Sequence, residues 1–195
     1  MRRLVADGCR RTVDIAVAAT LLVLLSPVMA VVAIVVRVRM GSPVLFRQRR
    51  LGRGAKPFEL RKFRSMHAPQ AGREGPEFDQ ERMGRLGRFL RSTSLDELPT
   101  LWNVLRGDMS LVGPRPLLVE YLPLYSSTQA RRHEVRPGVT GLAQAKGRNA
   151  LSWDQKFLYD VHYVDNCSFI MDMRILAMTV RQVLKRDGIA SDGYL

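Results

Sequence analysis

Residues 91–116 read RSTSLDELPTLWNVLRGDMSLVGPRP and combine a helical pattern, two adjacent carboxylates and a proline-rich corner. The apolar residues recur at the i, i+3, i+4, i+7 spacing of an amphipathic helix: Leu98, Leu101, Trp102 and Leu105. Gly107 is a suitable residue to end that helix. We therefore expect Asp96 and Glu97 to lie at the helix N-terminus.

Two N-caps are compatible with this helix. Ser94 followed by Glu97 three residues later matches a capping box. Asp96 as the cap would instead place Pro99 at the third helical position, where its missing N–H is not needed. We predict a cap at or within one residue of Asp96. In either arrangement the helix dipole favours an ionised carboxylate and attracts a phosphate.

Two arginines bracket the carboxylates. Arg91 precedes them, and Arg115 stands between Pro114 and Pro116, which fix the backbone on both sides. A guanidinium held in this way suits bidentate contact with a phosphate. Acidic residues are common in first turns of helices without any catalytic role. A carboxylate can also be a phosphoryl-accepting nucleophile, however, and a divalent cation beside it would neutralise phosphate oxygens.

The same stretch resembles the signature of the bacterial sugar transferase family, the monotopic phosphoglycosyl transferases that start glycan assembly on a polyprenol phosphate carrier. The resemblance continues in residues 62–66 (KFRSM), 136–141 (RPGVTG) and 147–153 (GRNALSW). Together these segments are spread from residue 62 to residue 153. The family usually has Trp where this chain has Leu142, and Val-Asn where it has Ala145 and Lys146, so the sugar and base preferences stay open.

The resemblance implies an enzyme that transfers a sugar-1-phosphate from a UDP-sugar to polyprenol (undecaprenyl) phosphate and releases UMP. This is the first membrane step of exopolysaccharide, O-antigen (lipopolysaccharide) or glycoprotein assembly. Asp96 would be the nucleophile, with Mg²⁺ as its metal, and Glu97 a proton acceptor or an orienting group. The residues implied to hold substrate phosphate, or to lie beside it, are Lys62, Arg91, Arg115 and Asp160. On the residues alone, Lys62 is a solvated strand lysine and Asp160 an exposed helix acid.

Residues 15–36 carry no charge, and nearly all are Ala, Val, Leu, Ile or Met. As a helix of about 33 Å they could cross a hydrocarbon core of about 30 Å. Ser26 and Pro27 at the middle predict a kink, in which the serine hydroxyl takes up a freed carbonyl. A cleaved signal peptide fits less well, because no small-x-small site precedes Arg37.

Arginines flank the apolar segment on both sides: Arg2, Arg3, Arg10 and Arg11 before it, and Arg37, Arg39, Arg47, Arg49 and Arg50 after it. Under the positive-inside rule both ends favour the cytoplasmic side. We therefore predict a re-entrant helix bent at Ser26-Pro27, as the resemblance also implies. A kinked helix that spans the bilayer remains the alternative.

The remaining segments predict short strands and helices. Strands over 43–46 and 57–63 around Gly52-Arg-Gly54 form a β-hairpin, with Lys62 on the same face as Leu60. Residues 67–77 form a loop, and Gly138 and Gly141 are free to take positive φ in a turn. Helices are expected over 78–91, 126–135, after the capping box of Ser152 and Gln155, and over 169–186. The apolar stripe of the last helix suits either a membrane surface or the protein core.

The 195-residue chain has a net charge of +13 and a pI near 10.8, which indicate an anionic partner. No RNP, KH, zinc-finger or basic-zipper pattern indicates binding to nucleic acid. Membrane lipids and phosphorylated substrates are therefore the favoured anionic partners. The two cysteines, Cys9 and Cys167, indicate neither a disulfide framework nor a CxxC metal site.

We therefore expect an α+β protein: a β-hairpin and amphipathic helices follow the re-entrant helix. Residues 1–40 would be the membrane anchor and residues 41–195 a cytosol-facing catalytic domain, monotopic on the cytoplasmic face of the bacterial inner (plasma) membrane. The expected partners are the nucleotide-sugar donor, the polyprenol phosphate acceptor and membrane lipids, and a homo-oligomer is compatible with the sequence. The alternative is a non-enzymatic, membrane-anchored basic adapter that binds acidic lipid or nucleic acid and does not need Asp96.

Overall fold

The computed structural model describes residues 2–68, 78–147 and 150–185. Its first elements are α1 (Arg2–Leu24), α2 (Ser26–Met40), β1 (Leu45–Leu51), η1 (Arg53–Ala55), β2 (Pro57–Phe63), α3 (Asp79–Arg82), α4 (Arg85–Ser92), η3 (Leu95–Glu97) and α5 (Thr100–Arg106). They are followed by β3 (Ser110–Val112), η4 (Val119–Leu124), α6 (Ser127–Ala130), η5 (Arg131–Glu134), β4 (Gly138–Thr140), α7 (Leu142–Lys146), α8 (Trp153–Asn166) and α9 (Phe169–Lys185). This mixture of helices with two small sheets confirms the α+β class.

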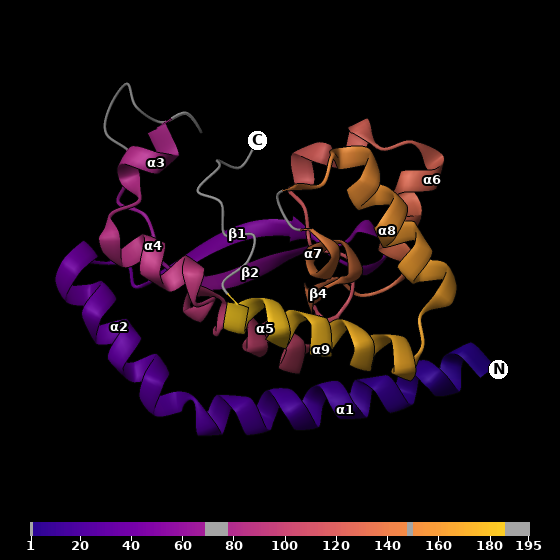
Figure 1. Ribbon diagram of the computed structural model, residues 1–195, viewed down its shortest axis with the longest axis horizontal. Helices are drawn as coiled ribbons and strands as arrows, with labels where there is room; N and C mark the ends of the chain where they lie inside the picture. Colours follow the sequence, from indigo (N-terminus) through magenta and orange to yellow (C-terminus); the bar gives the residue numbers. More distant parts are fainter. Residues whose placement is uncertain (1, 69–77, 148–149, 186–195) are drawn as a thin grey trace.

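The N-terminal helices form a bent arm. Figure 1 shows α1 running along α5 and α9, and α2 turning up beside α4. Segments Gly8–Leu24 and Ser26–Met40 meet at 61°, and the Ser26 hydroxyl donates a hydrogen bond of 2.8 Å to the Val23 carbonyl. Pro27 stands in the first turn of α2, where a missing N–H costs nothing. The predicted kink is confirmed. No single helix among the described residues is long and apolar enough to cross a bilayer, although the bent pair meets those criteria jointly.

Charged residues in the first half of α1 bind the rest of the protein. Arg11 donates to two carbonyl oxygens in the last turns of α5, at 2.5 and 2.8 Å. The buried Asp14 accepts from the Ser110 hydroxyl at 2.8 Å and from a backbone N–H of β3 at 3.0 Å. Arg10 forms an ion pair of 2.8 Å with Asp172 of α9. Arg10 and Arg11, two of the arginines that flank the apolar segment, therefore have structural contacts.

The predicted hairpin is present, with β1 and β2 antiparallel from Leu45 opposite Phe63 to Leu51 opposite Pro57. The first strand begins two residues later than expected and extends through the arginine-rich residues 47–50, because pairing with β2 outweighs their polarity. Asn103 of α5 holds this hairpin through its side chain. Its amide donates to the Glu59 carbonyl at 2.7 Å and accepts from the Arg61 N–H at 3.2 Å.

A second, parallel pairing joins β3 to β4, with Ser110 opposite Gly138 and Val112 opposite Thr140. A Cβ on Gly138 would lie 2.1 Å from the Gly113 nitrogen, so the glycine is needed for close backbone approach. Gly138 and Gly141, which are free to take positive φ, do not adopt it here. This close approach holds the segment that leads into Pro114.

The helices mostly follow the sequence pattern. The helix expected over 78–91 is divided into α3 and α4 at Gly84. The capping box predicted at Ser152 is formed, and Ser126 forms a further one that was not predicted. Helix α9 buries Ile175 completely against the domain, on another side of the helix from the predicted apolar stripe. Most of the described stripe stays exposed, including Phe169, Ile170, Met173 and Val180, so the stripe does not mainly serve the core. Most of the predicted loop over 67–77 lies outside the described residues.

Candidate active site

The turn that carries the two carboxylates is a short 3-10 helix, η3, and not the first turn of α5. Glu97 N–H bonds to the Ser94 carbonyl at 3.1 Å, and α5 begins only after Pro99, its N-cap. Pro99 has no N–H, so the hydrogen-bond ladder is interrupted there. Ser94 has φ +57° and makes no side-chain cap. Both predicted caps are therefore wrong, whereas the predicted end at Gly107 is confirmed by its φ of +92°.

Asp96 is a buried carboxylate, only 6% exposed. Burial and the neighbouring charge of Glu97 raise its pKa to about 6, against the opposing effect of Lys62, Arg91 and Arg115. Asp96 is therefore mostly ionised at neutral pH but less strongly solvated than a surface aspartate. A poorly solvated carboxylate beside cations is suited to nucleophilic attack on a phosphate.

Glu97 is held by two cations. Lys62 Nζ lies 2.5 Å from Glu97 Oε1, and Arg115 Nη2 lies 3.5 Å from the same oxygen. Burial alone would raise the pKa of Glu97, but these two positive charges and their hydrogen bonds outweigh it and lower the pKa to about 2. The two adjacent carboxylates thus differ strongly in proton affinity, a common mark of divided roles.

Arg91 and Arg115 reach the site from different elements. Arg91, in the last turn of α4, donates from Nε to the Ser65 hydroxyl at 3.0 Å and from Nη2 to Met66 Sδ at 2.9 Å. The backbone of Arg115 is also fixed, because its carbonyl oxygen accepts a hydrogen bond of 2.7 Å from the Arg132 side chain. Lys62 and Arg115 thus contact Glu97, and Arg91 lies near enough to Asp96 to lower its pKa.

Asp160 lies behind this cluster. Asp160 is only 4% exposed, so the prediction that it is an exposed acid on a helix is wrong. Its Oδ2 accepts two hydrogen bonds from Arg132, at 3.1 and 2.7 Å, and Arg132 also donates to the Tyr125 hydroxyl at 3.2 Å. Among the described contacts Asp160 therefore reaches the site through Arg132 and Arg115.

Sequence reasoning missed two residues that position the site. Arg132 lies in a segment expected to be a polar helix, and nothing in its neighbours distinguishes it from Arg131. Asn103 did carry a signal, because it is a polar residue between Trp102 and Val104 in an apolar helix. It is 1% exposed and links α5 to β2, the strand that carries Lys62.

Around Glu97 the side chains enclose a cavity of about 20 Å³. Its lining comprises Arg50, Leu60, Lys62, Glu97, Thr100, Met109, Arg115, Pro116, Gly138 and Val139. Leu60 and Lys62 share this lining, as their alternation in β2 predicts. Ser26 and Pro27 are not part of it and lie at the bend of the arm.

Within the described ranges no three His, Cys, Asp or Glu side chains converge as a metal site. Mg²⁺ commonly binds through one or two carboxylates together with substrate phosphates and water. Asp96 could supply one such ligand, while Glu97 is already paired with Lys62 and Arg115. The residues therefore fit a cation that arrives with a diphosphate and not a site built by the protein alone.

Comparison with known proteins agrees with this geometry. Residues 5–186 match the family model for bacterial sugar transferases. The chain is 50% identical over 186 residues to EpsL, an uncharacterized sugar transferase of Bacillus subtilis, covering 95% of this chain and 92% of the relative. A UDP-glucose:undecaprenyl-phosphate glucose-1-phosphate transferase of Caulobacter vibrioides is 38% identical over 198 residues, covering 95% and 73%. An undecaprenyl-phosphate galactose phosphotransferase of Salmonella typhimurium is 39% identical over 196 residues, covering 92% and 41%.

The buried carboxylate, the surrounding cations and these relatives define the chain as an enzyme of the phosphoglycosyl transferase class. It belongs to the bacterial sugar transferase family. The alternative of a non-enzymatic adapter is therefore set aside.

Proposed function

We propose that this chain transfers a sugar-1-phosphate from a UDP-sugar to undecaprenyl phosphate, giving undecaprenyl-diphospho-sugar and UMP. The observation that carries the proposal is Asp96, a buried carboxylate with a pKa of about 6 beside three cations. The Caulobacter and Salmonella relatives bear names for this chemistry with glucose and galactose. The product would begin a membrane-linked glycan, as in exopolysaccharide or lipopolysaccharide synthesis.

The reaction proceeds in two displacements. An Asp96 carboxylate oxygen attacks the β-phosphorus of the donor, and the bond from that phosphorus to the bridging oxygen breaks as UMP leaves. An acyl phosphate now joins Asp96 to the sugar phosphate. A phosphate oxygen of the acceptor then attacks the same phosphorus, the bond to Asp96 breaks, and the carboxylate is regenerated.

The cations stabilise the negative charge of the phosphates. Lys62, Arg91 and Arg115 all lower the pKa of Asp96, so all act electrostatically on the place where the phosphates react. Mg²⁺, held by Asp96 and the diphosphate, would supply further charge neutralisation. Glu97 orients Lys62 and Arg115, because a carboxylate with a pKa of about 2 is a poor proton acceptor. Asp160 acts as a positioning residue through Arg132.

In this proposal the bent arm anchors the site at the membrane. Large apolar side chains are exposed on both sides of the bend, including Val23 (73%), Leu24 (68%) and Ile34 (63%). Such a surface is suited to lipid, and Arg37 and Arg39 in the last turn of α2 suit an anionic headgroup layer. We therefore place residues 1–40 as a re-entrant anchor and residues 41–195 at the cytoplasmic face of the bacterial inner membrane. In a background that lacks Cys9 and Cys167, an impermeant thiol reagent should label Arg2→Cys and Ser42→Cys from the same side of a vesicle, and opposite-side labelling would contradict re-entry.

UMP release is the direct test of this function. The protein in detergent or nanodiscs would be incubated with Mg²⁺, undecaprenyl phosphate and single UDP-sugars, including UDP-glucose and UDP-galactose. We expect one or a few sugars to give UMP together with an equal amount of lipid-linked sugar. Nucleotide release without lipid-linked product would instead indicate hydrolysis.

The pH profile should report the ionisation of Asp96. Attack needs the carboxylate, so kcat/KM should fall as pH decreases through about 6. Lys62 lowers the pKa of Asp96, and Lys62→Met should therefore raise that pKa and move the acid limb upward by about one pH unit. Arg174→Met, at an exposed position of α9, is a matched control that should leave the limb in place. An unmoved limb in Lys62→Met would show that the limb belongs to another group.

A further inference from the structure

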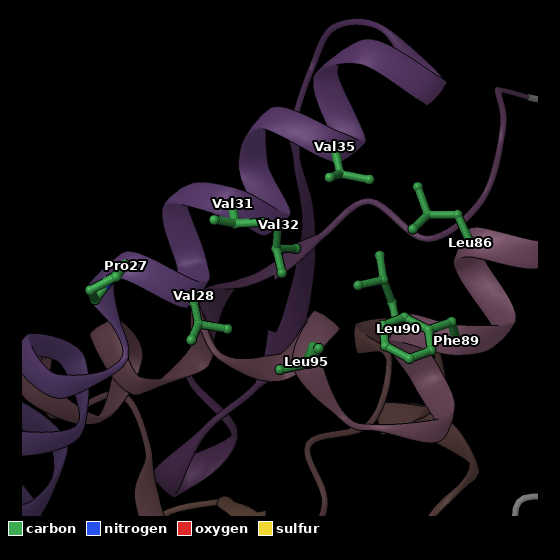
Figure 2. A pocket seen from close by; sticks show the side chains of 9 residues that line it. All are labelled: Pro27, Val28, Val31, Val32, Val35, Leu86, Phe89, Leu90 and Leu95. Carbon is green, nitrogen blue, oxygen red and sulfur yellow. The ribbon is translucent and has the colours of Figure 1, made fainter.

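The two halves of the N-terminal arm contact the rest of the protein in different ways. Figure 2 shows that the α2 side chains lining the groove toward α4, such as Val28, Val32 and Val35, are apolar. The other half, α1, instead buries charged groups: Asp14 is 6% exposed, and the Arg10 side chain is 15% exposed. Burying charges gives little net stability, because the cost of desolvation opposes their mutual attraction. Stability alone therefore does not account for the charged contacts of α1.

Asp14 holds the start of β3. Its two carboxylate oxygens accept hydrogen bonds from the Ser110 hydroxyl at 2.8 Å and from the Leu111 N–H at 3.0 Å. Both bonds are buried, where a polar group without a partner is costly. One side chain of the arm thus fixes two successive residues of a strand that lies 96 and 97 residues later in the chain.

The end of β3 is held through a second path from the same helix. The hydroxyl of the buried Tyr163 lies 3.1 Å from the Val112 carbonyl oxygen and 2.8 Å from a carboxylate oxygen of Asp172, within hydrogen-bond distance of both acceptors. Arg10 of α1 pairs with Asp172 at 2.8 Å and also donates to the Tyr163 hydroxyl. Arg10 therefore orients the carboxylate and the hydroxyl that meet the last residue of β3.

Each residue from the start of β3 to Arg115 is anchored. Pro114 fixes φ in this run. A shift of β3 is therefore passed on to Arg115, because little slack lies between them. Besides the contacts of Asp14 and Tyr163, the anchors are the hydrogen bonds from Ser110 N–H to the Pro137 carbonyl (2.8 Å), from Gly113 N–H to the Thr140 carbonyl (2.9 Å), from Gly138 N–H to the Pro114 carbonyl (3.0 Å) and from Arg132 to the Arg115 carbonyl (2.7 Å).

We propose that Asp14 and Tyr163 are positioning residues for the transfer reaction, which hold β3 in place and thereby set the position of Arg115 in the active site. Arg115 contacts Glu97 at 3.5 Å and acts electrostatically on Asp96, so its position bears directly on the chemistry. The proposal rests on the proposed function and extends the site to the buried face of α1. This half of the arm then has a role in catalysis besides its role at the membrane.

A matched pair of substitutions tests the role of Asp14. Asp14→Asn and Asp14→Leu both remove the charge and are similar in size, but only Asn can still bond to Leu111 and Ser110. Asp14→Leu should lower kcat about tenfold, because a displaced Arg115 stabilises the phosphate charge less well. Asp14→Asn should restore most of that loss. Thr12→Val removes an exposed hydroxyl that bonds within α1, and this control should match wild type.

The pH profile separates positioning from a loss of stability. Arg115 lowers the pKa of Asp96, so displacement of Arg115 should raise that pKa and move the acid limb of kcat/KM upward, by about half a pH unit in Asp14→Leu. Tyr163→Phe keeps the ring in the core and removes only the hydroxyl, and it should move the limb in the same direction. A smaller amount of folded protein would lower the rate at every pH and leave the limb in place.

All variants would be assayed in nanodiscs of one phospholipid composition, at equal amounts of folded protein. The same kcat and acid limb in Asp14→Leu and Asp14→Asn would overturn the role of Asp14, and an unmoved limb in Tyr163→Phe would overturn that of Tyr163. Ser110→Ala removes one of the two bonds to Asp14 and decides the same question if Asp14→Leu does not fold. Failure of the proposed function is distinct, since the wild type would then form no lipid-linked sugar.

Discussion

Replacing Asp96 by Asn should abolish UMP release, with a loss on the order of 10⁴-fold or more, as for other enzymes that lose their nucleophile. The amide has nearly the shape of the carboxylate but cannot form the acyl phosphate. The measurement is UMP formed in a single turnover, with enzyme in excess over the UDP-sugar that the wild type uses. Asp154→Asn removes a carboxylate from an exposed position in the first turn of α8 and should retain wild-type activity.

Stability separates this loss from damage to the fold. The pKa of Asp96 is about 6 in the folded protein, above the ordinary value for an aspartate. A raised folded pKa means that stability is highest while Asp96 is protonated and falls as the pH rises through about 6. Asn cannot ionise, so the variant should unfold at the same temperature as wild type or higher at pH 7.5. Substantial UMP release by a stably folded Asp96→Asn variant would contradict the covalent route. An Asp96→Asn variant that is less stable than wild type at pH 7.5 would contradict the inference that burial of the charged carboxylate costs stability.

The proposed covalent intermediate would give a second readout. After donor is added without acceptor, wild-type protein should gain the mass of one sugar phosphate, and the Asn variant should not. Acyl phosphates are labile to hydroxylamine, so the added mass should disappear on treatment. A persistent adduct would place the phosphate on a different side chain.

The bend of the N-terminal arm could be predicted because its causes are local. A proline removes one helix hydrogen bond, and the preceding serine can satisfy the freed carbonyl, as the Ser26 contact with Val23 confirms. The end of α5 at Gly107 could be predicted for the same reason, because a glycine that ends a helix depends only on the adjacent residues. The start of α5 differs from both capping patterns, because a separate 3-10 turn precedes Pro99 and neither pattern includes such a turn.

The contacts around the site depended on pairings distant in sequence. Lys62 and Glu97 are 35 residues apart, and Arg132 and Asp160 are 28 apart. Periodicity identifies a helix face but not the partner across it, so Asp160 was expected to be exposed. The family resemblance supplied Lys62, Arg91 and Arg115 as a set, and the structure brings them around Asp96. Arg132 lies outside the motifs that carry the family resemblance, so only the fold identifies it as a residue that positions the site.

The buried pair of Arg132 and Asp160 provides the second large prediction. These side chains are 3% and 6% exposed and lie 2.7 Å apart. Asp160→Ala leaves the Arg132 guanidinium buried without its carboxylate, which typically costs about 3–5 kcal/mol. For a chain of this size the unfolding midpoint should fall on the order of 10 °C. Activity should fall as well, because Arg132 also holds the Arg115 carbonyl.

A double variant distinguishes loss of stability from loss of positioning. Arg132→Met with Asp160→Leu removes both charges and replaces them with apolar groups, which is often nearly neutral for buried pairs. Its unfolding midpoint should therefore recover most of the loss seen in Asp160→Ala. Its kcat should stay low, since the hydrogen bond from Arg132 to Arg115 is gone and Arg115 must hold both Glu97 and the donor phosphates. If activity returned together with stability, Arg132 would be a structural residue only, and the orientation of Arg115 would depend on Pro114 and Pro116 alone.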